Sequence, residues 1–229
     1  WRRADVYPAL GSLFRGAIRL GRLTLTDPTA DLKIPERVIP GPEGPNTSPA
    51  TGPAALQDRL RGWVARGAGL APGARLQIHN GELQLHQGRR TLLDLDRLEV
   101  DLRLPPGTLH LKLRAASDAW GQLSVTARTP PDLTDFKADV TLREARLERL
   151  QLWPDWLPAW GSPSGAVDLR LKLAGDAGTA WAGRIAMASA EVGWSQGDRN
   201  AHLRQLDLEA DLEVDAAGFQ VDLQRLNVA

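Results

Sequence analysis

The sequence predicts a mostly β protein: a long, strongly twisted antiparallel sheet that forms a groove, as an open gutter or incomplete barrel, with one or two short helices. Three observations predict this fold. Aliphatic and charged residues alternate over most of the chain, which places them on opposite faces of a strand. The alternation breaks and resumes at recurring places. One segment of the sequence also repeats roughly 110 residues further on.

The N-terminal part, residues 1–39, is expected to supply strands that join the groove. Residues 40–53 are dense in proline and glycine and predict a flexible loop, because neither residue sustains a regular element there. A short helix is expected over Ala54–Arg66. Its apolar positions, which fall on one helical face, are Leu56, Leu60, Trp63 and Val64.

Residues 54–229 are expected to form a repeating β-groove segment. The alternation is clearest over Leu95–Leu104, where the pair Asp96–Arg97 interrupts it. The aliphatic residues on both sides of that pair can share a face only if the strand bulges there. The other interruptions of this form are Gly21–Arg22, Arg204–Gln205 and Gln224–Arg225. Because bulges bend strands, these repeated interruptions predict a deeply curved sheet.

The repeat units are approximately residues 76–113 and 185–223. Within them Leu76–Gly88 aligns with Ile185–Gly197, and the later aliphatic positions follow in the same order. A module of several strands added end to end is typical of quasi-one-dimensional proteins. The alternative is a chance match between two amphipathic sets of strands.

A second interruption of the sheet is expected over Glu144–Trp160. Leu147 and Leu150 suit a helical turn, which the prolines that follow would end. This segment also contains a cluster of indole side chains, which suit either a membrane interface or, as the favoured interpretation, ordinary core at one end of the sheet. The cluster comprises Trp153, Trp156 and Trp160.

Nothing in the sequence has the form of a catalytic or metal site. The chain has no cysteine, which excludes disulfides, thiolate metal sites and cysteine catalysis. The carboxylates alternate with leucine as on a solvated face, and Gly161–Gly165 is a turn rather than a nucleophile elbow. The histidines fall on polar faces without ligand partners and are His79, His86, His110 and His202. The sequence therefore predicts no enzyme, no catalytic residue, no metal and no cofactor.

The charge balance is neutral, with 28 basic and 28 acidic residues. A neutral chain has no electrostatic reason to seek nucleic acid or an anionic membrane surface, so nucleic acid is not expected as a partner. No apolar run approaches the roughly 18 residues of a spanning helix. Because the sequence begins at Trp1 rather than methionine, it is expected to be a piece of a longer chain.

Three stretches carry a family resemblance: Ser12–Leu32, Pro72–Arg103, and the strand from Gly165 with the segments that follow it to Val192. Their order and spacing resemble the AsmA-like family, of the YhdP and TamB type, which are repeating β-groove lipid-bridge proteins. The tryptophan-rich stretch and the proline-rich loop depart from that pattern.

The resemblance implies a non-enzymatic segment of a cell-envelope protein of Gram-negative bacteria. Such a segment would carry phospholipid along an apolar groove between the inner and outer membrane. It would lie in the periplasm, anchored to the inner membrane through an upstream segment. Its partners would be phospholipid acyl chains, the remainder of its own longer chain, and inner- and outer-membrane components.

The residues themselves support one part of that implication, since a long aliphatic face must be covered by something. The alternative is a structural β-scaffold or outer-membrane assembly module with a closed dry core and no lipid. If the groove interpretation holds, aliphatic residues of the alternating strands line it. The expected lining is Leu95, Leu98, Val100, Leu102, Leu111, Leu113, Leu123, Val125, Leu169, Leu171, Leu206, Leu208, Leu212, Val221 and Leu223.

Overall fold

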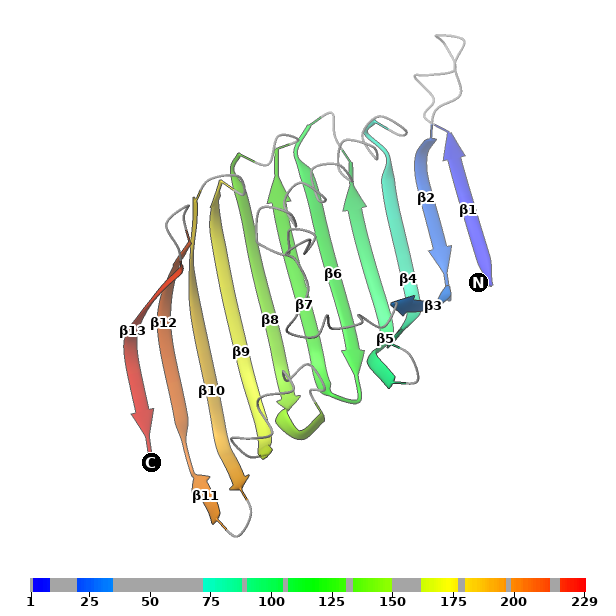
Figure 1. The fold of residues 1–229 in the computed structure, drawn as a ribbon. Helices are drawn as coiled ribbons and strands as arrows, with labels where there is room; N and C mark the ends of the chain where they lie inside the picture. The colour runs from blue at the N-terminus through cyan, green and yellow to red at the C-terminus, as the bar shows by residue number, and fades with distance from the viewer. Residues whose placement is uncertain are drawn as a thin grey trace, which may run out of the picture.

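The structure, a computed structural model, describes residues 2–8, 20–34, 72–87, 90–104, 107–130, 134–149, 162–176, 180–196, 199–214 and 219–229. These residues form one sheet of thirteen strands that does not close into a barrel (Figure 1). The strands are β1 (Arg3–Pro8), β2 (Leu20–Thr26), β3 (Thr29–Ile34), β4 (Arg75–Gln87), β5 (Arg90–Arg103), β6 (Leu109–Ser117), β7 (Trp120–Thr129), β8 (Phe136–Arg146), β9 (Ser162–Asp176), β10 (Ala180–Gln196), β11 (Arg199–Leu203), β12 (Leu206–Val214) and β13 (Phe219–Val228).

The sheet is largely a meander, in which each strand pairs with its neighbour in the sequence. The order is β1-β2-β4-β5-β6-β7-β8-β9-β10-β12-β13, with β3 beside β4 and β11 beside β10. All pairs are antiparallel except β2–β4 and β3–β4, which are parallel. The parallel pairs are possible because the long connection between β3 and β4 carries the chain back to the other end of the sheet. The two ends of the chain lie at opposite edges (Figure 1).

Two pairs of short strands act as single interrupted strands. β2 and β3 pair with successive halves of β4, and Asp27 and Pro28 lie between them. β12 and β11 likewise pair with successive halves of β10. Counted across the sheet there are therefore eleven strand positions, which we call paths, and two of these paths consist of two short strands placed end to end.

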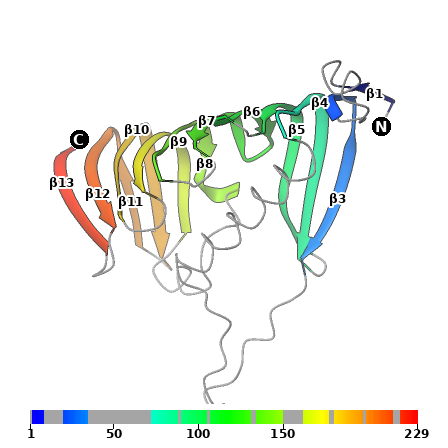
Figure 2. The same ribbon diagram turned by 90° about the horizontal axis from the view of Figure 1, so that it is seen from above.

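These breaks fall at one level and define a line across the sheet, which we call the crease. Four non-glycine residues on it have positive φ, at 50° for Asp27, 53° for Asn80, 51° for Arg97 and 54° for Glu144. The register of β4–β5, β5–β6, β8–β9 and β9–β10 shifts at the same level. Each shift is a bulge, which bends its strand. Aligned bulges therefore bend the strands at this level. Figure 2 shows that the sheet as a whole also arches across the strand order, from β13 to β3.

Side chains on a neighbouring strand, or in one case on the same strand, satisfy backbone groups that the bulges release from the ladder. The Asn80 amide donates to the Glu99 carboxylate at 3.0 Å, and the Glu144 amide donates to the Asp168 carboxylate at 2.8 Å. On β10 the Glu191 amide donates to the Ser189 hydroxyl at 3.2 Å. Unpaired backbone N–H groups are costly, so these contacts stabilise the bent form of the sheet.

The main cluster of buried residues lies at the crease and on one face. It consists of Leu95, Leu98, Ala115, Ala119, Trp120, Ala145 and Val167. Ala145 is 0% exposed, whereas its neighbour Glu144 on the other face is exposed. In a single bent layer the inner side crowds its side chains together and the outer side spreads them. The apolar face is therefore the concave face, and the charged face is the convex one.

The predicted bulges are confirmed at three of the four places. The register shifts opposite Asp96–Arg97, Gly21 and Gln224, and Leu95 and Leu98 lie in one core cluster. At Arg204–Gln205 the interruption is a full break between β11 and β12. At that break the backbone amides of Arg204 and Gln205 both donate to the Ala229 carbonyl, at 2.6 and 3.2 Å.

The predicted helical segments fare differently. Residues 40–53, Ala54–Arg66 and the cluster of Trp153, Trp156 and Trp160 lie outside the described residues. Of the second interruption, Glu144–Arg146 belongs to β8 and was wrongly placed outside the sheet. The bulge at Glu144 hides the alternation there, but the strand continues beyond it. The helical turn itself is a 3₁₀ turn, η1 (Leu147–Arg149), the one helical element among the described residues.

Arg97 is exposed and has a left-handed backbone conformation, which predicts that a glycine variant at this position is more stable than a valine variant. Arg97→Gly should raise the free energy of unfolding by up to about 1 kcal/mol or leave it unchanged, because glycine accepts positive φ without strain. Arg97→Val should lower it by about 1–2 kcal/mol, because a β-branched residue is strained there. Urea denaturation measures both.

Lys112 is the control, since it is exposed and lies in a regularly paired part of β6. There valine should be at least as stable as glycine, as in any ordinary strand. The same order at both positions would contradict the assignment of a bulge to Arg97.

Candidate functional site: the apolar face of the sheet

The concave face carries rows of apolar side chains that run across the strands from edge to edge. Residues paired across two strands point to the same face, so the pairing defines each row. The middle row crosses all eleven paths without a polar residue. It consists of Ala4, Leu25, Ile78, Val100, Leu113, Val125, Val140, Leu171, Ile185, Ala210 and Leu223.

A second row lies two residues closer to one end of the strands, and we call it the rim row. It consists of Val6, Leu23, Leu76, Leu102, Leu111, Ala127, Ala138, Leu173, Gly183, Leu212 and Val221. A third, on the crease side of the middle row, is shorter. This crease row consists of Ala115, Leu123, Leu142, Leu169, Met187, Leu208 and Leu226.

All fifteen residues of the predicted lining lie on this face. The rim row includes Leu102, Leu111, Leu212 and Val221, and the middle row includes Val100, Leu113, Val125, Leu171 and Leu223. The crease row includes Leu123, Leu169 and Leu208. Leu95 and Leu98 belong to the buried core at the crease. Leu206 pairs with Ser189 and Val228 on the same face, beyond the crease row.

Several members of the face were missed from the sequence. They include Leu23, Leu25, Ile78, Val140 and Ile185. The alternation that could have found them is present in each of their strands. What the alternation cannot give is the pairing that joins them to the predicted residues in one row.

The apolar face is only half covered. Most residues of the middle row on the inner strands are of intermediate exposure, whereas Ala210 on β12 is buried. The edges are open, with Val6 at 64% and Leu223 at 56% exposed. Within the described ranges η1 is the only element outside the sheet. Eleven paths about 4.8 Å apart give rows roughly 48 Å long. Two adjacent rows then cover on the order of 600 Å² in projection.

The convex face is charged and held by ion pairs between strands. Arg184 on β10 contacts Asp211 on β12 at 2.8 Å, and Arg170 on β9 contacts Asp139 on β8 at 3.2 Å. Arg75 binds both oxygens of Asp101, at 2.7 and 2.5 Å. This hydrogen-bonded pairing lowers the pKa of the Asp101 carboxyl below its ordinary value and raises the pKa of Arg75.

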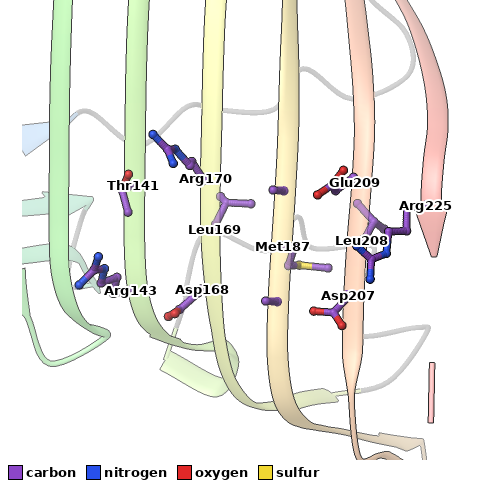
Figure 3. A pocket seen from close by; sticks show the side chains of 12 residues that line it. Thr141, Arg143, Asp168, Leu169, Arg170, Met187, Asp207, Leu208, Glu209 and Arg225 are labelled. Carbon is purple, nitrogen blue, oxygen red and sulfur yellow. The ribbon is translucent and has the colours of Figure 1, made fainter. Parts of the chain in front are cut away.

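A shallow hollow of about 260 Å³ lies on the convex face over β8–β10, β12 and β13 (Figure 3). It exists because the short side chains of Ala186 and Ala188 on β10 lie between longer charged ones. Those charged neighbours are Arg143, Asp168, Arg170, Asp207, Glu209 and Arg225. Three cations balance three anions, and the lining holds no histidine or cysteine. The hollow is therefore a less specific candidate than the apolar face.

The described residues also contain no group of three or more side chains placed to hold a metal ion. Among the same residues no helix combines the length and hydropathy of a membrane span. No protein-family model matches the chain. Searches of curated proteins and of solved structures likewise return no match.

The Arg75–Asp101 pair predicts a small pH-dependent effect on stability. The Asp101 pKa is lower in the folded protein than in the unfolded chain, where it lies near 4. The ion pair therefore stabilises the fold fully above that unfolded pKa, and this stabilisation is lost as the pH falls through the folded pKa. Asp101→Asn should lower the free energy of unfolding by about 0.5 kcal/mol at pH 7, since both side chains are partly exposed and screened. This difference should shrink toward pH 2.5.

Urea denaturation at the two pH values measures the effect, and the Arg75→Gln background supplies the control. Without the guanidinium, Asp101→Asn should change little at either pH. An effect of Asp101→Asn that stays constant between the two pH values would contradict the pairing.

Proposed function

We propose that the apolar face binds the acyl chains of lipids and that the chain is a non-enzymatic, lipid-carrying segment of a longer protein. The observation that supports this most directly is the middle row, which crosses the whole sheet without a polar residue and stays partly exposed at most of its positions. A surface of that form is stable in water only when something apolar covers it.

The energetics favour acyl chains as that cover. Each methylene buried contributes about 0.8 kcal/mol, so six methylenes contribute roughly 5 kcal/mol without any specific polar contact. A bilayer's hydrocarbon core is about 30 Å thick, so one acyl chain extends about 15 Å. Rows of about 48 Å can therefore hold more than one chain. The uniform aliphatic lining offers no polar group that would select a headgroup.

The resemblance to AsmA-like proteins extends the proposal. The longer protein would lie in the periplasm of a Gram-negative bacterium, attached to the inner membrane, and phospholipid would move along the groove between the two membranes. The competing function is a structural or assembly scaffold, whose apolar face would be covered by protein. The open edges of the apolar face suit either function, so the occupant of the face must be identified directly.

A matched pair of substitutions on β7 tests acyl binding. Val125 lies in the middle row, and its neighbour Thr126 has the same shape but points to the convex face. Val125→Asp should reduce binding of a fluorescent fatty acid by at least tenfold, because an acyl chain would cover the carboxylate and strip its water. Thr126→Asp adds the same charge and should leave binding unchanged. Urea denaturation of each variant verifies that it is folded.

Identification of the ligand completes the test. Mass spectrometry of an organic extract of the gently purified protein should detect phospholipid. A photocrosslinking residue at position 125 should capture it, and one at position 126 should not. A lipid-free extract, together with equal capture at both positions, would refute acyl binding and favour the scaffold.

A further inference from the structure

One end of the strands carries a row of basic side chains on the convex face. From β2 to β8, six successive paths contribute one residue each at the same level, and no acidic residue interrupts them. This basic row consists of Arg22, Arg75, Arg103, His110, Arg128 and Lys137. At about 4.8 Å between paths it is roughly 24 Å long. The same level continues beyond β8 as Ala174 and Ala182, so the basic residues are confined to one half of the sheet.

Most of these charges lack an anionic partner within the sheet. Arg75 is bound to Asp101, and Lys137 lies 3.5 Å from Asp135. The guanidinium of Arg22 lies over the Tyr7 ring at 5.7 Å. Arg103 and Arg128 are exposed and form no salt bridge with a described residue, although Arg103 is near enough to Asp101 to help lower the pKa of that carboxyl. Like charges placed directly opposite each other destabilise a sheet, so the alignment suits an external anionic surface rather than the fold.

The same strand ends are apolar on their other face. Each member of the basic row is adjacent in sequence to a member of the rim row, as Arg75 is to Leu76 and Arg103 to Leu102. The edge of the sheet along this side therefore has cations on its convex face and aliphatic side chains on its concave face. Arginine and lysine can also extend their charged ends past the strand while their stems pack along it.

We propose that this edge docks on a bilayer surface rich in anionic phospholipid headgroups. Headgroups would contact the basic row, and the rim row beside it would face the acyl region. The proposal rests on the acyl-binding function, for which this edge would be the side of entry. A soluble anionic partner would need only the cations and would leave the adjoining apolar rim unused, which is why the bilayer surface is favoured.

Vesicle flotation of the full 229-residue chain tests the proposal. The protein should float with phosphatidylcholine vesicles that contain phosphatidylglycerol, less so with phosphatidylcholine alone, and the binding should weaken as salt rises. The variant Arg22→Gln/Arg103→Gln/Arg128→Gln removes three cations that no described carboxylate pairs. Each cation near an anionic surface contributes about a factor of five, so the partition coefficient should fall about 100-fold.

The matched control is Arg114→Gln/Arg143→Gln/Arg225→Gln, which removes three exposed arginines of the same face away from the edge. Its partitioning should stay within about threefold of the unchanged protein, since it contacts no headgroup. Equal losses in the two variants would overturn the proposal, because net charge alone would then explain binding. Equal flotation with both kinds of vesicle would also overturn it. So would binding to a soluble polyanion without flotation, which would assign the row to a soluble partner.

Co-purifying lipid separates this proposal from the function on which it rests. The edge variant should retain bound lipid at the level of the unchanged protein, whereas Val125→Asp should lose it. If the unchanged protein retains lipid but does not dock on anionic vesicles, the docking surface alone would be overturned. Loss of lipid from the edge variant would assign the three arginines to lipid retention and overturn their role in docking.

Discussion

The crease is the constraint on which the rest of this structure depends. Side chains alternate between the two faces of a strand, so a long strand without a bulge would need aliphatic and charged residues to alternate without interruption. Each bulge shifts the pattern by one residue and so returns the aliphatic residues to the concave face beyond it. Leu95 and Leu98 share the core for this reason. The carboxylates of Glu99 and Asp168 stabilise two of the bulges, because they accept hydrogen bonds from the backbone amides that the bulges release from the ladder. The bulges therefore both bend the strands and keep the aliphatic side chains on the concave face.

Local features of the sequence were enough to predict the fold class and the position of most bulges. A phase break such as Asp96–Arg97 is visible in a few residues and needs no knowledge of distant ones. The same alternation placed the predicted lining on one face. The alternation gives no sign that the carboxylates of Glu99 and Asp168 accept hydrogen bonds from bulge amides, since those contacts depend on which strand lies alongside.

Features that depend on pairing could not be predicted. The parallel pairing of β2 and β3 with β4 depends on the path of a long connection. The basic row joins residues as distant in sequence as Arg22 and Lys137. The balanced overall charge even argues against an anionic surface as partner, because it averages over faces and ends that the sheet separates. A neutral chain can present a strongly cationic edge once register has sorted its charges.

The meander order also has a consequence for how the protein folds. Almost every strand pairs with its sequence neighbour through a short connection, so the entropy lost in closing each hairpin is small. Formation of the sheet can begin at any of several hairpins and spread outward, as in repeat proteins. The exception is the contact of β2 and β3 with β4, which closes a loop of some forty residues between Ile34 and Arg75. That contact therefore has a larger loop-closure cost than the hairpins, and β1 gains its partner strand only when β2 is in place.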